Sequence, residues 1–245
     1  MMIKAVVAYD GWKYAGWQKQ ENAVGIQDII EKALGKIHHK PVSILASGRT
    51  DTKVHALGQV FQFEPLENMP PYKYVQALNT LLPEDIRIQN AEYVADTFHA
   101  RFDAVSKTYM YVCTYDWNNP FTYRYKAKMR TELDLEAMRQ GAVHLIGEHD
   151  FTSFSSSKID PRKPRIKKIF RIDIEQEGKD VRFIYEGNGF LRYQVRMMTG
   201  ALIEVGKHTI EPETIKTMLE KKDKDACRYN AKGHGLYLVS VKYGS

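Results

Sequence analysis

The sequence has few of the residues and patterns that mark a disulfide, a metal site or a nucleotide cofactor. Only two cysteines, Cys113 and Cys227, occur in 245 residues, and they form no CxxC pair, so neither a disulfide framework nor a zinc site is expected. The eight histidines show no metal-ligand spacing, and no Ser or Cys nucleophile motif is present. The stretch "GNGFLRYQ" lacks the third glycine of a dinucleotide fingerprint, because Arg192 stands there. We therefore expect neither a metal nor a nucleotide cofactor.

Long apolar runs are also missing. The least polar stretch, "MMTGALIEVG", is interrupted by Glu204 and is too short to span a bilayer, and the N-terminus shows no signal-peptide pattern. With 43% hydrophobic and 27% charged residues the chain can bury a core. Its net charge of +6 would attract a polyanion such as nucleic acid. These properties predict a soluble, cytoplasmic protein.

Apolar periodicity predicts an α+β fold made of two halves. In the first hundred residues, strands are expected at 3–9, 42–46, 58–64 and 85–95, and helices at 26–37 and 72–82. This β-α-β-β-α-β order is that of a ferredoxin-like unit. The second half repeats the pattern, with strands at 107–115, 166–176, 181–187 and 235–243 and helices at 134–147, 190–205 and 212–222. We predict halves at 1–104 and 105–245, with a site in the cleft between them.

Two short stretches combine turn-forming residues with groups capable of chemistry. "SGRTDTKVHA" sets Arg49 and Asp51 just before a strand. Asp51 is either a turn or N-cap residue or an acid held in a loop for catalysis. "YDGWKYAGWQKQ" carries Trp12, Lys13 and Trp17, a mixture that can stack bases and neutralise phosphates or can cap a core.

Basic residues gather in the second half of the chain. The segment "KIDPRKPRIKKIFR" has seven basic residues and one acidic residue, as a phosphate-binding surface requires, although such a run is also typical of a solvated loop. A predicted helix places Arg192 and Arg196 at i, i+4, on one face. Their partner is a phosphate, a carboxylate such as Asp51, or water. The candidate RNA-binding residues are Trp12, Lys13, Trp17, Lys163, Arg165, Lys167, Lys168 and Arg192.

Taken together, several segments resemble the tRNA pseudouridine synthase A family. They are "YDGWKYAGWQKQ", "GRTDTKVHALGQV", "FHARFDAVSKTYMY", "GEHDFTSF", "FLRYQVRMMTGALIEVG" and "GLYLVSV", in the order of the family and over nearly the whole chain. The resemblance implies two ferredoxin-like halves sharing a mostly antiparallel sheet, and a homodimer that acts on the anticodon arm of tRNA. The chain departs from the family pattern at Lys53, usually Gly, and at Lys107, usually Arg.

The resemblance also implies roles for individual residues. Asp51 is the catalytic carboxylate. Among the substrate-binding residues, Arg49 displaces the target base and Tyr109 packs on the flipped uracil. Arg196 pairs with the Asp51 carboxylate, and Leu236 forms a wall of the pocket. The reaction breaks the bond from ribose C1′ to uracil N1 and rejoins C1′ to C5. Asp51 serves as a nucleophile or as a base. Burial would raise its pKa, and a guanidinium would lower it.

Two other function classes fit parts of the sequence. The first is a non-catalytic RNA-binding protein made from two RRM-like halves, although neither half has the aromatic RNP1 pattern. The second is a glycosidase-like hydrolase, which needs a second convergent acid, and no partner for Asp51 is evident in the sequence.

Overall fold

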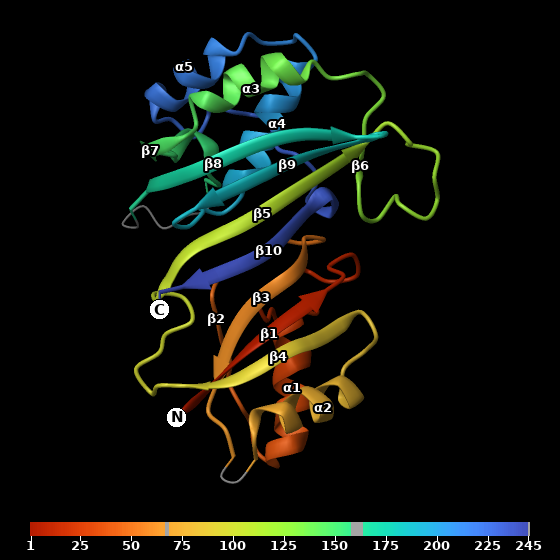
Figure 1. The fold of residues 1–245 in the computed structure, drawn as a ribbon, viewed down its shortest axis with the longest axis vertical. Helices are drawn as coiled ribbons and strands as arrows, with labels where there is room; N and C mark the ends of the chain where they lie inside the picture. Colours follow the sequence, from red (N-terminus) through yellow and green to blue (C-terminus); the bar gives the residue numbers. More distant parts are fainter. Residues whose placement is uncertain (67–68, 158–163, 245) are drawn as a thin grey trace. The chain divides into compact units, whose positions relative to one another are not determined.

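A computed structural model of the chain describes residues 1–66, 69–157 and 164–244. The chain divides into two compact units (Figure 1): unit 1 comprises Met1–Val105 and Tyr237–Ser245, and unit 2 comprises Ser106–Leu236. The α+β class expected from the sequence is confirmed, with mostly antiparallel strands in both units. The expected second half, 105–245, differs at its end. The last strand lies in unit 1 because Tyr237 and Leu238 pair with His55 and Ala56.

Unit 1 has the predicted β-α-β-β-α-β order. Its elements are β1 (Met2–Tyr9), α1 (Ile26–His38), β2 (Leu45–Ala46), β3 (His55–Phe63), α2 (Pro71–Leu81), β4 (Ile86–Val94) and the added strand β10 (Leu236–Tyr243). The strands lie in the order β4-β1-β3-β10, antiparallel except for the parallel pair β3 and β10. The strand expected at 42–46 is only the two-residue β2, which pairs with β3.

The core of unit 1 follows from the periodicities of its elements. β1 buries alternate residues, Ile3, Ala5 and Val7, because successive strand side chains point to opposite faces. α1 buries Ile26 and Ile30, one turn apart, on its apolar stripe. Figure 1 shows α1 and α2 next to each other, and the two helices are in contact.

Unit 2 contains the remaining strands and helices. They are β5 (Ala104–Thr114), which starts just before the unit boundary, β6 (Ala127–Lys128), α3 (Leu135–Val143), β7 (Gly147–Asp150), β8 (Ile166–Glu177), β9 (Asp180–Gly187), α4 (Gln194–Gly206) and α5 (Glu213–Lys221), with 3-10 turns at Thr152–Phe154 and Gly233–Gly235. The antiparallel order is β5-β9-β8-β7, and β6 runs parallel to β5. α3 contacts α4, α5 and β8, and Figure 1 shows the three helices grouped together.

Two predicted helices of unit 2 are too long. The helix expected at 134–147 ends at Val143, and the chain continues into the unpredicted strand β7, which begins at Gly147 with φ +107°. The helix expected at 190–205 begins only at Gln194, because Tyr193 adopts a left-handed conformation with φ 67°. A left-handed residue cannot belong to a right-handed helix, so the apolar pattern extends beyond the helical backbone.

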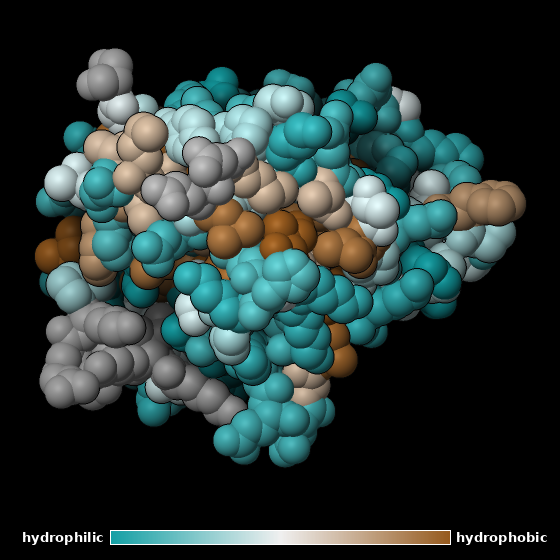
Figure 2. All heavy atoms as spheres, turned by 90° about the horizontal axis from the view of Figure 1, so that it is seen from below, coloured by the Kyte–Doolittle hydropathy of each residue, from teal (hydrophilic) through white to brown (hydrophobic). Residues whose placement is uncertain are grey.

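One face of the molecule is mainly polar, and both cysteines are buried. Figure 2 shows a mainly hydrophilic face with apolar residues gathered across its middle. Cys113 and Cys227 are buried free thiols, and burial raises their pKa values to about 12 and about 11. Within the described part of the chain, no helix combines the length and apolar character needed to cross a bilayer.

Candidate active site

The loop that carries Asp51 lies against the glycine-containing loop that follows β1. Trp17 N–H donates to the carbonyl of Thr50 over 3.1 Å, and Lys53 N–H donates to the carbonyl of Tyr14 over 3.3 Å. Two glycines permit this approach. A Cβ on Gly11 would lie 2.0 Å from the carbonyl oxygen of Val54, and one on Gly16 would lie 2.5 Å from that of Thr50. Gly16 also has φ +94°, a conformation that L side chains rarely adopt. The two sequence motifs therefore form one packed structure.

A buried glutamine in β3 holds the other side of this loop. The Gln59 side chain is fully buried; its Oε1 accepts from Ser47 Oγ over 2.7 Å and its Nε2 donates to the carbonyl of Gly48 over 3.0 Å. Ser47 N–H also donates to the carbonyl of Val60. A buried amide is stable only when its polar atoms are paired, so these bonds fix Gln59 and the loop together.

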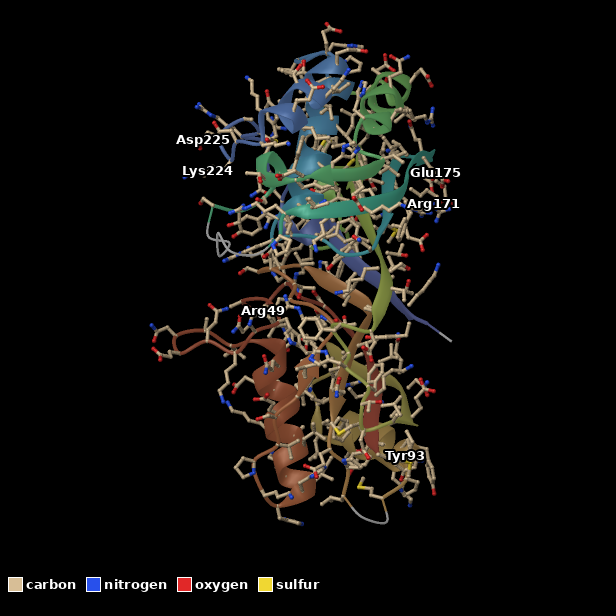
Figure 3. All side chains as sticks on the ribbon, turned by 90° about the vertical axis from the view of Figure 1, so that its left-hand side faces the viewer. Arg49, Tyr93, Arg171, Glu175, Lys224 and Asp225 are labelled. Carbon is tan, nitrogen blue, oxygen red and sulfur yellow. The ribbon has the colours of Figure 1, made fainter. Side chains whose placement is uncertain are left out.

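Asp51 itself lies at the turn that ends the loop. Its carbonyl accepts from Val54 N–H over 3.1 Å, and its side chain is half-exposed. The preceding residue, Thr50, is buried, and its Oγ1 is 2.8 Å from the hydroxyl of Tyr9 on β1. The chain on both sides of Asp51 is thus fixed, and Asp51 itself is half-buried. Arg49, two residues earlier, is exposed on the same loop (Figure 3).

Unit 2 carries the other residues proposed for the site. Tyr109 lies in β5 opposite Tyr185 of β9, with 9% of its surface exposed. Its ring meets the edge of Phe190, with ring centroids 5.1 Å apart at 81°, a favourable aromatic geometry. Leu236 is 5% exposed and begins β10, directly after the 3-10 turn at Gly233–Gly235.

Arg196 is held in place by backbone and aromatic contacts. It lies in the first turn of α4, where its Nε donates to the carbonyl of Ala231 over 2.7 Å, and its own carbonyl accepts from Ala231 N–H over 2.9 Å. The guanidinium lies 4.9 Å from the ring centroid of Tyr193, within the range of a cation–π interaction. Arg196 is half-buried, so its orientation is defined before any ligand arrives.

The expectation that Arg192 and Arg196 share one helix face is wrong. Arg192 precedes α4, since the left-handed Tyr193 separates it from the helix. The two guanidinium groups nevertheless meet at one side chain. That of Arg192 lies 5.0 Å from the Tyr193 ring centroid, and that of Arg196 lies 4.9 Å from it. Arg192 is exposed.

The sequence pattern of tRNA pseudouridine synthases matches residues 5–103 and 142–244. The chain belongs to the tRNA pseudouridine synthase family. Its relatives named tRNA pseudouridine synthase A include one from an Exiguobacterium species (strain AT1b), 46% identical over 98% of this chain and 97% of the relative. Those from Bacillus pumilus and Bacillus subtilis are 41% and 39% identical over 99% of both chains. The family isomerises uridine to pseudouridine in tRNA, so the chain is an isomerase rather than a binding module or a hydrolase.

The departure from the family pattern at Lys53 has a structural counterpart. Lys53 has φ 64°, the left-handed region that favours glycine, which is the residue that the family resemblance leads us to expect there. Its ammonium nitrogen lies 4.4 Å from the ring centroid of Trp12. This cation–π contact partly offsets the backbone strain, because such pairs contribute about 0.5–1 kcal/mol at exposed sites.

The three candidates from the first aromatic stretch have different surroundings. Trp17 is 2% exposed and packs against Tyr9 and Phe61 in the core of unit 1. Its assignment as an RNA-binding residue is therefore wrong, because its ring cannot stack on a base without leaving the core. Trp12 is half-buried, and Lys13 is exposed, 3.6 Å from Asp85.

The basic run does not form a one-sided surface along β8. Lys167 and Lys168 are successive strand residues, so their side chains project to opposite faces. Lys168 is exposed and Lys167 is half-buried. Arg165 precedes the strand, and its Nη1 donates to Ser155 Oγ over 3.0 Å. Lys163 lies outside the described residues.

Sequence reasoning missed the residues that hold the Asp51 loop. Gln59 was the detectable one, because a glutamine that alternates with Phe61 and Phe63 on one face of the strand "GQVFQFE" needs a buried partner. Gln62 of the same strand is analogous: its Oε1 accepts from Ala100 N–H and its Nε2 donates to the carbonyl of Phe98. In residues 1–66, 69–157 and 164–244, no group of three or more His, Cys, Asp or Glu side chains is placed to hold a metal ion.

Proposed function

We propose that this tRNA pseudouridine synthase acts on the anticodon stem-loop and that Asp51 is its catalytic carboxylate. The observation that carries the proposal is the construction of the Asp51 loop. The loop is hydrogen-bonded to β1 through the side chain of Thr50, and to β3 and the loop after β1 through its backbone, and Asp51 itself is half-buried. Such preorganisation suits a group that must meet the ribose in one geometry, since proximity and orientation lower the barrier.

The proposed reaction needs a fixed, ionised carboxylate. The bond from C1′ to N1 breaks, the uracil turns, and C1′ joins C5, which then loses its proton. Asp51 acts either by attacking C1′ or by removing a ribose proton. In this proposal Arg49 displaces the target uridine from its stack, Tyr109 packs on the flipped base, and Leu236 walls the pocket, offsetting an unstacking cost of a few kcal/mol.

The proposal assigns Arg196 to the carboxylate of Asp51. A guanidinium near a carboxylate stabilises the ionised form and lowers its pKa. The assignment follows the family resemblance, and within unit 2 Arg196 is held by Ala231 and Tyr193. If it is correct, Arg196→Gln raises the pKa of Asp51, and the acidic limb of the kcat/KM profile moves to higher pH. An unchanged acidic limb would remove Arg196 from this role.

The central test is Asp51→Asn. We expect this variant to fold and bind tRNA but to release no tritium from uridine labelled at C5, because the amide can neither attack C1′ nor accept the ribose proton. The control is Asp96→Asn, which changes an acid on the surface of unit 1 that is 76% exposed and should retain full turnover. Tritium release by Asp51→Asn at a rate near that of the control would refute the assignment.

We also propose that the enzyme is a homodimer in the cytoplasm, as the resemblance implied. Sedimentation equilibrium of the purified chain tests the dimer, since it gives the mass directly. A mass near 28.3 kDa, that of one chain, at all protein concentrations would contradict it. Fractionation of cells that express the tagged chain tests the location.

A further inference from the structure

A loop in unit 2 exposes an unusual number of aromatic side chains. This aromatic loop, residues 115–126, connects β5 to β6, and Figure 1 shows it extending away from the strands. Four of its rings are exposed: Trp117 by 41%, Phe121 by 86%, Tyr123 by 38% and Tyr125 by 37%. One exposed apolar residue is ordinary, but a cluster of them marks an interaction surface. The loop lies outside the two segments that match the family pattern.

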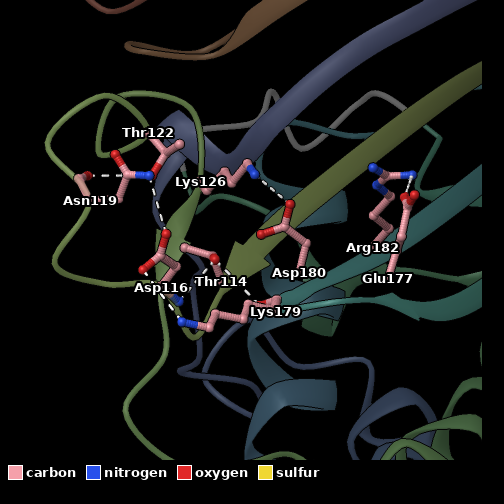
Figure 4. Close-up of polar contacts among 9 residues, drawn as sticks. All are labelled: Thr114, Asp116, Asn119, Thr122, Lys126, Glu177, Lys179, Asp180 and Arg182. Carbon is pink, nitrogen blue, oxygen red and sulfur yellow. Dashed lines mark hydrogen bonds and ion pairs between the residues drawn. The ribbon is translucent and has the colours of Figure 1, made fainter.

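The loop is held in one conformation at its base (Figure 4). Asn119 joins two points of it, since its Nδ2 donates to Asp116 Oδ2 over 3.2 Å and its Oδ1 accepts from Phe121 N–H over 3.0 Å. Thr122 accepts from Tyr125 N–H through its carbonyl over 2.9 Å. Lys126 forms a half-buried ion pair with Asp180 of β9. Phe121 is therefore presented by an ordered backbone, which reduces the entropy lost on binding.

Cations accompany the exposed rings. The Arg124 guanidinium lies 5.4 Å from the Tyr123 ring centroid, and its Nε donates to the Tyr123 hydroxyl over 2.9 Å. The Arg130 guanidinium, just beyond β6, lies 5.5 Å from the Trp117 ring centroid. Residues 116–130 contain four basic residues and one acidic residue. Stacking rings beside cations are the composition that binds unpaired nucleotides, and the excess of basic over acidic residues favours a polyanion as the ligand.

We propose that the aromatic loop is a second contact for the tRNA substrate, in which Phe121 stacks on an unpaired base and Arg124 and Arg130 contact neighbouring phosphates. The inference rests on the proposed function, because it takes tRNA as the ligand. It adds a contact that neither the family pattern nor the assignment of Asp51 requires. Stacking of one base on one ring corresponds to a change of about fivefold to 140-fold in affinity.

The test compares substitutions at Phe121 in the full-length enzyme. Dissociation constants for transcribed tRNA are measured by fluorescence anisotropy at fixed salt, and turnover is measured at saturating tRNA. We expect Phe121→Ala and Phe121→Leu to bind about fivefold to 140-fold more weakly, and Phe121→Trp to bind as the wild type does, because a base stacks on an aromatic face. Turnover at saturation should be unchanged in all three variants.

A matched control has an exposed ring beside a cation on another element. Tyr72 of α2 is 59% exposed, with the Lys73 ammonium 5.8 Å from its ring centroid. Tyr72→Ala should leave tRNA affinity unchanged. Equal losses for Tyr72→Ala and Phe121→Ala would overturn the proposal, because any exposed ring would then have the same effect.

Two further results would also overturn it. The first is unchanged affinity for Phe121→Ala while the wild type produces pseudouridine, an outcome that leaves the proposed function intact. The second is a combination of two observations: Phe121→Leu binds tRNA as tightly as the wild type, and Phe121→Ala changes the sedimentation mass. Together they would identify the loop as an apolar contact between two copies of the chain. Absence of pseudouridine from wild-type reactions, by contrast, would refute the proposed function itself.

Discussion

Replacing Gly16 with alanine should separate the stability of unit 1 from the placement of the loop that carries Asp51. The new Cβ would lie 2.5 Å from the carbonyl oxygen of Thr50 and 2.9 Å from the carbonyl carbon of Asp51. To reach an ordinary contact of 3.4 Å, the Asp51 loop must move by about 0.9 Å. The left-handed region itself costs about 1–2 kcal/mol for an L residue. Both effects follow from one added methyl group.

The expected size of the two effects differs. A strain of 1–2 kcal/mol lowers the melting temperature by about 2–8 °C in a chain of this length. A catalytic group misplaced by about 1 Å reduces the rate by about 100-fold, which corresponds to about 2.7 kcal/mol in the activation free energy. We therefore expect Gly16→Ala to fold with a modestly lower melting temperature and to lose about two orders of magnitude in kcat, measured by tritium release at saturating tRNA.

Gly178 supplies the matched control for this substitution. It has φ +58°, but no heavy atom lies within 4 Å of its Cβ position. Gly178→Ala should show a similar fall in melting temperature and a normal kcat. If Gly16→Ala retained kcat within twofold of the wild type, the close approach of the two loops would not be what positions Asp51, and the reasoning would fail.

Three other changes have defined outcomes. Burial, with a smaller effect from Lys40, lowers the pKa of His38 below 6.5. Because the unfolded chain then binds more protons than the folded one, the free energy of unfolding falls as pH drops below 6.5. Thermal melts should therefore show a weaker pH dependence in His38→Gln than in the wild type. Tyr193→Ala removes the ring beside Arg196 and should lower kcat, whereas Tyr193→Phe keeps the ring and should retain the wild-type kcat. Equal losses of kcat in both variants would refute a role for the ring. Lys168→Gln should reduce the salt slope of tRNA binding by about 0.7–0.9, and an identical effect of Lys167→Gln would contradict their separation on opposite faces of β8.

Local periodicity predicted most of the secondary structure. The apolar stripe of α1 and the alternation in β1 and β9 are patterns within a few residues, and the elements have nearly the expected bounds. The errors occurred where backbone conformation overrides apolar spacing. The pattern at 190–205 continues through Tyr193, although a left-handed residue there prevents helix formation.

The candidate site was only partly accessible to the same reasoning. Asp51 and Arg49 were identified from the short motif "GRTD", because a family motif can be recognised from the residues alone. Tyr9 and Gly16 contact the Asp51 loop from about 34 to 41 positions away, and Gln59 contacts it from 11 positions away. No pattern along the chain indicates such pairs.

The sequence by itself determined the family, the α+β class and the order of the first six elements, and it singled out Asp51 as the candidate catalytic residue. Only the tertiary structure decided which of two similar residues is internal: Trp17 is in the core, while Trp12 is half-buried. It also decided that Gly16 must be small. The physical reason is that burial and close approach depend on contacts between segments distant in the chain, whereas element type depends on neighbours a few residues away.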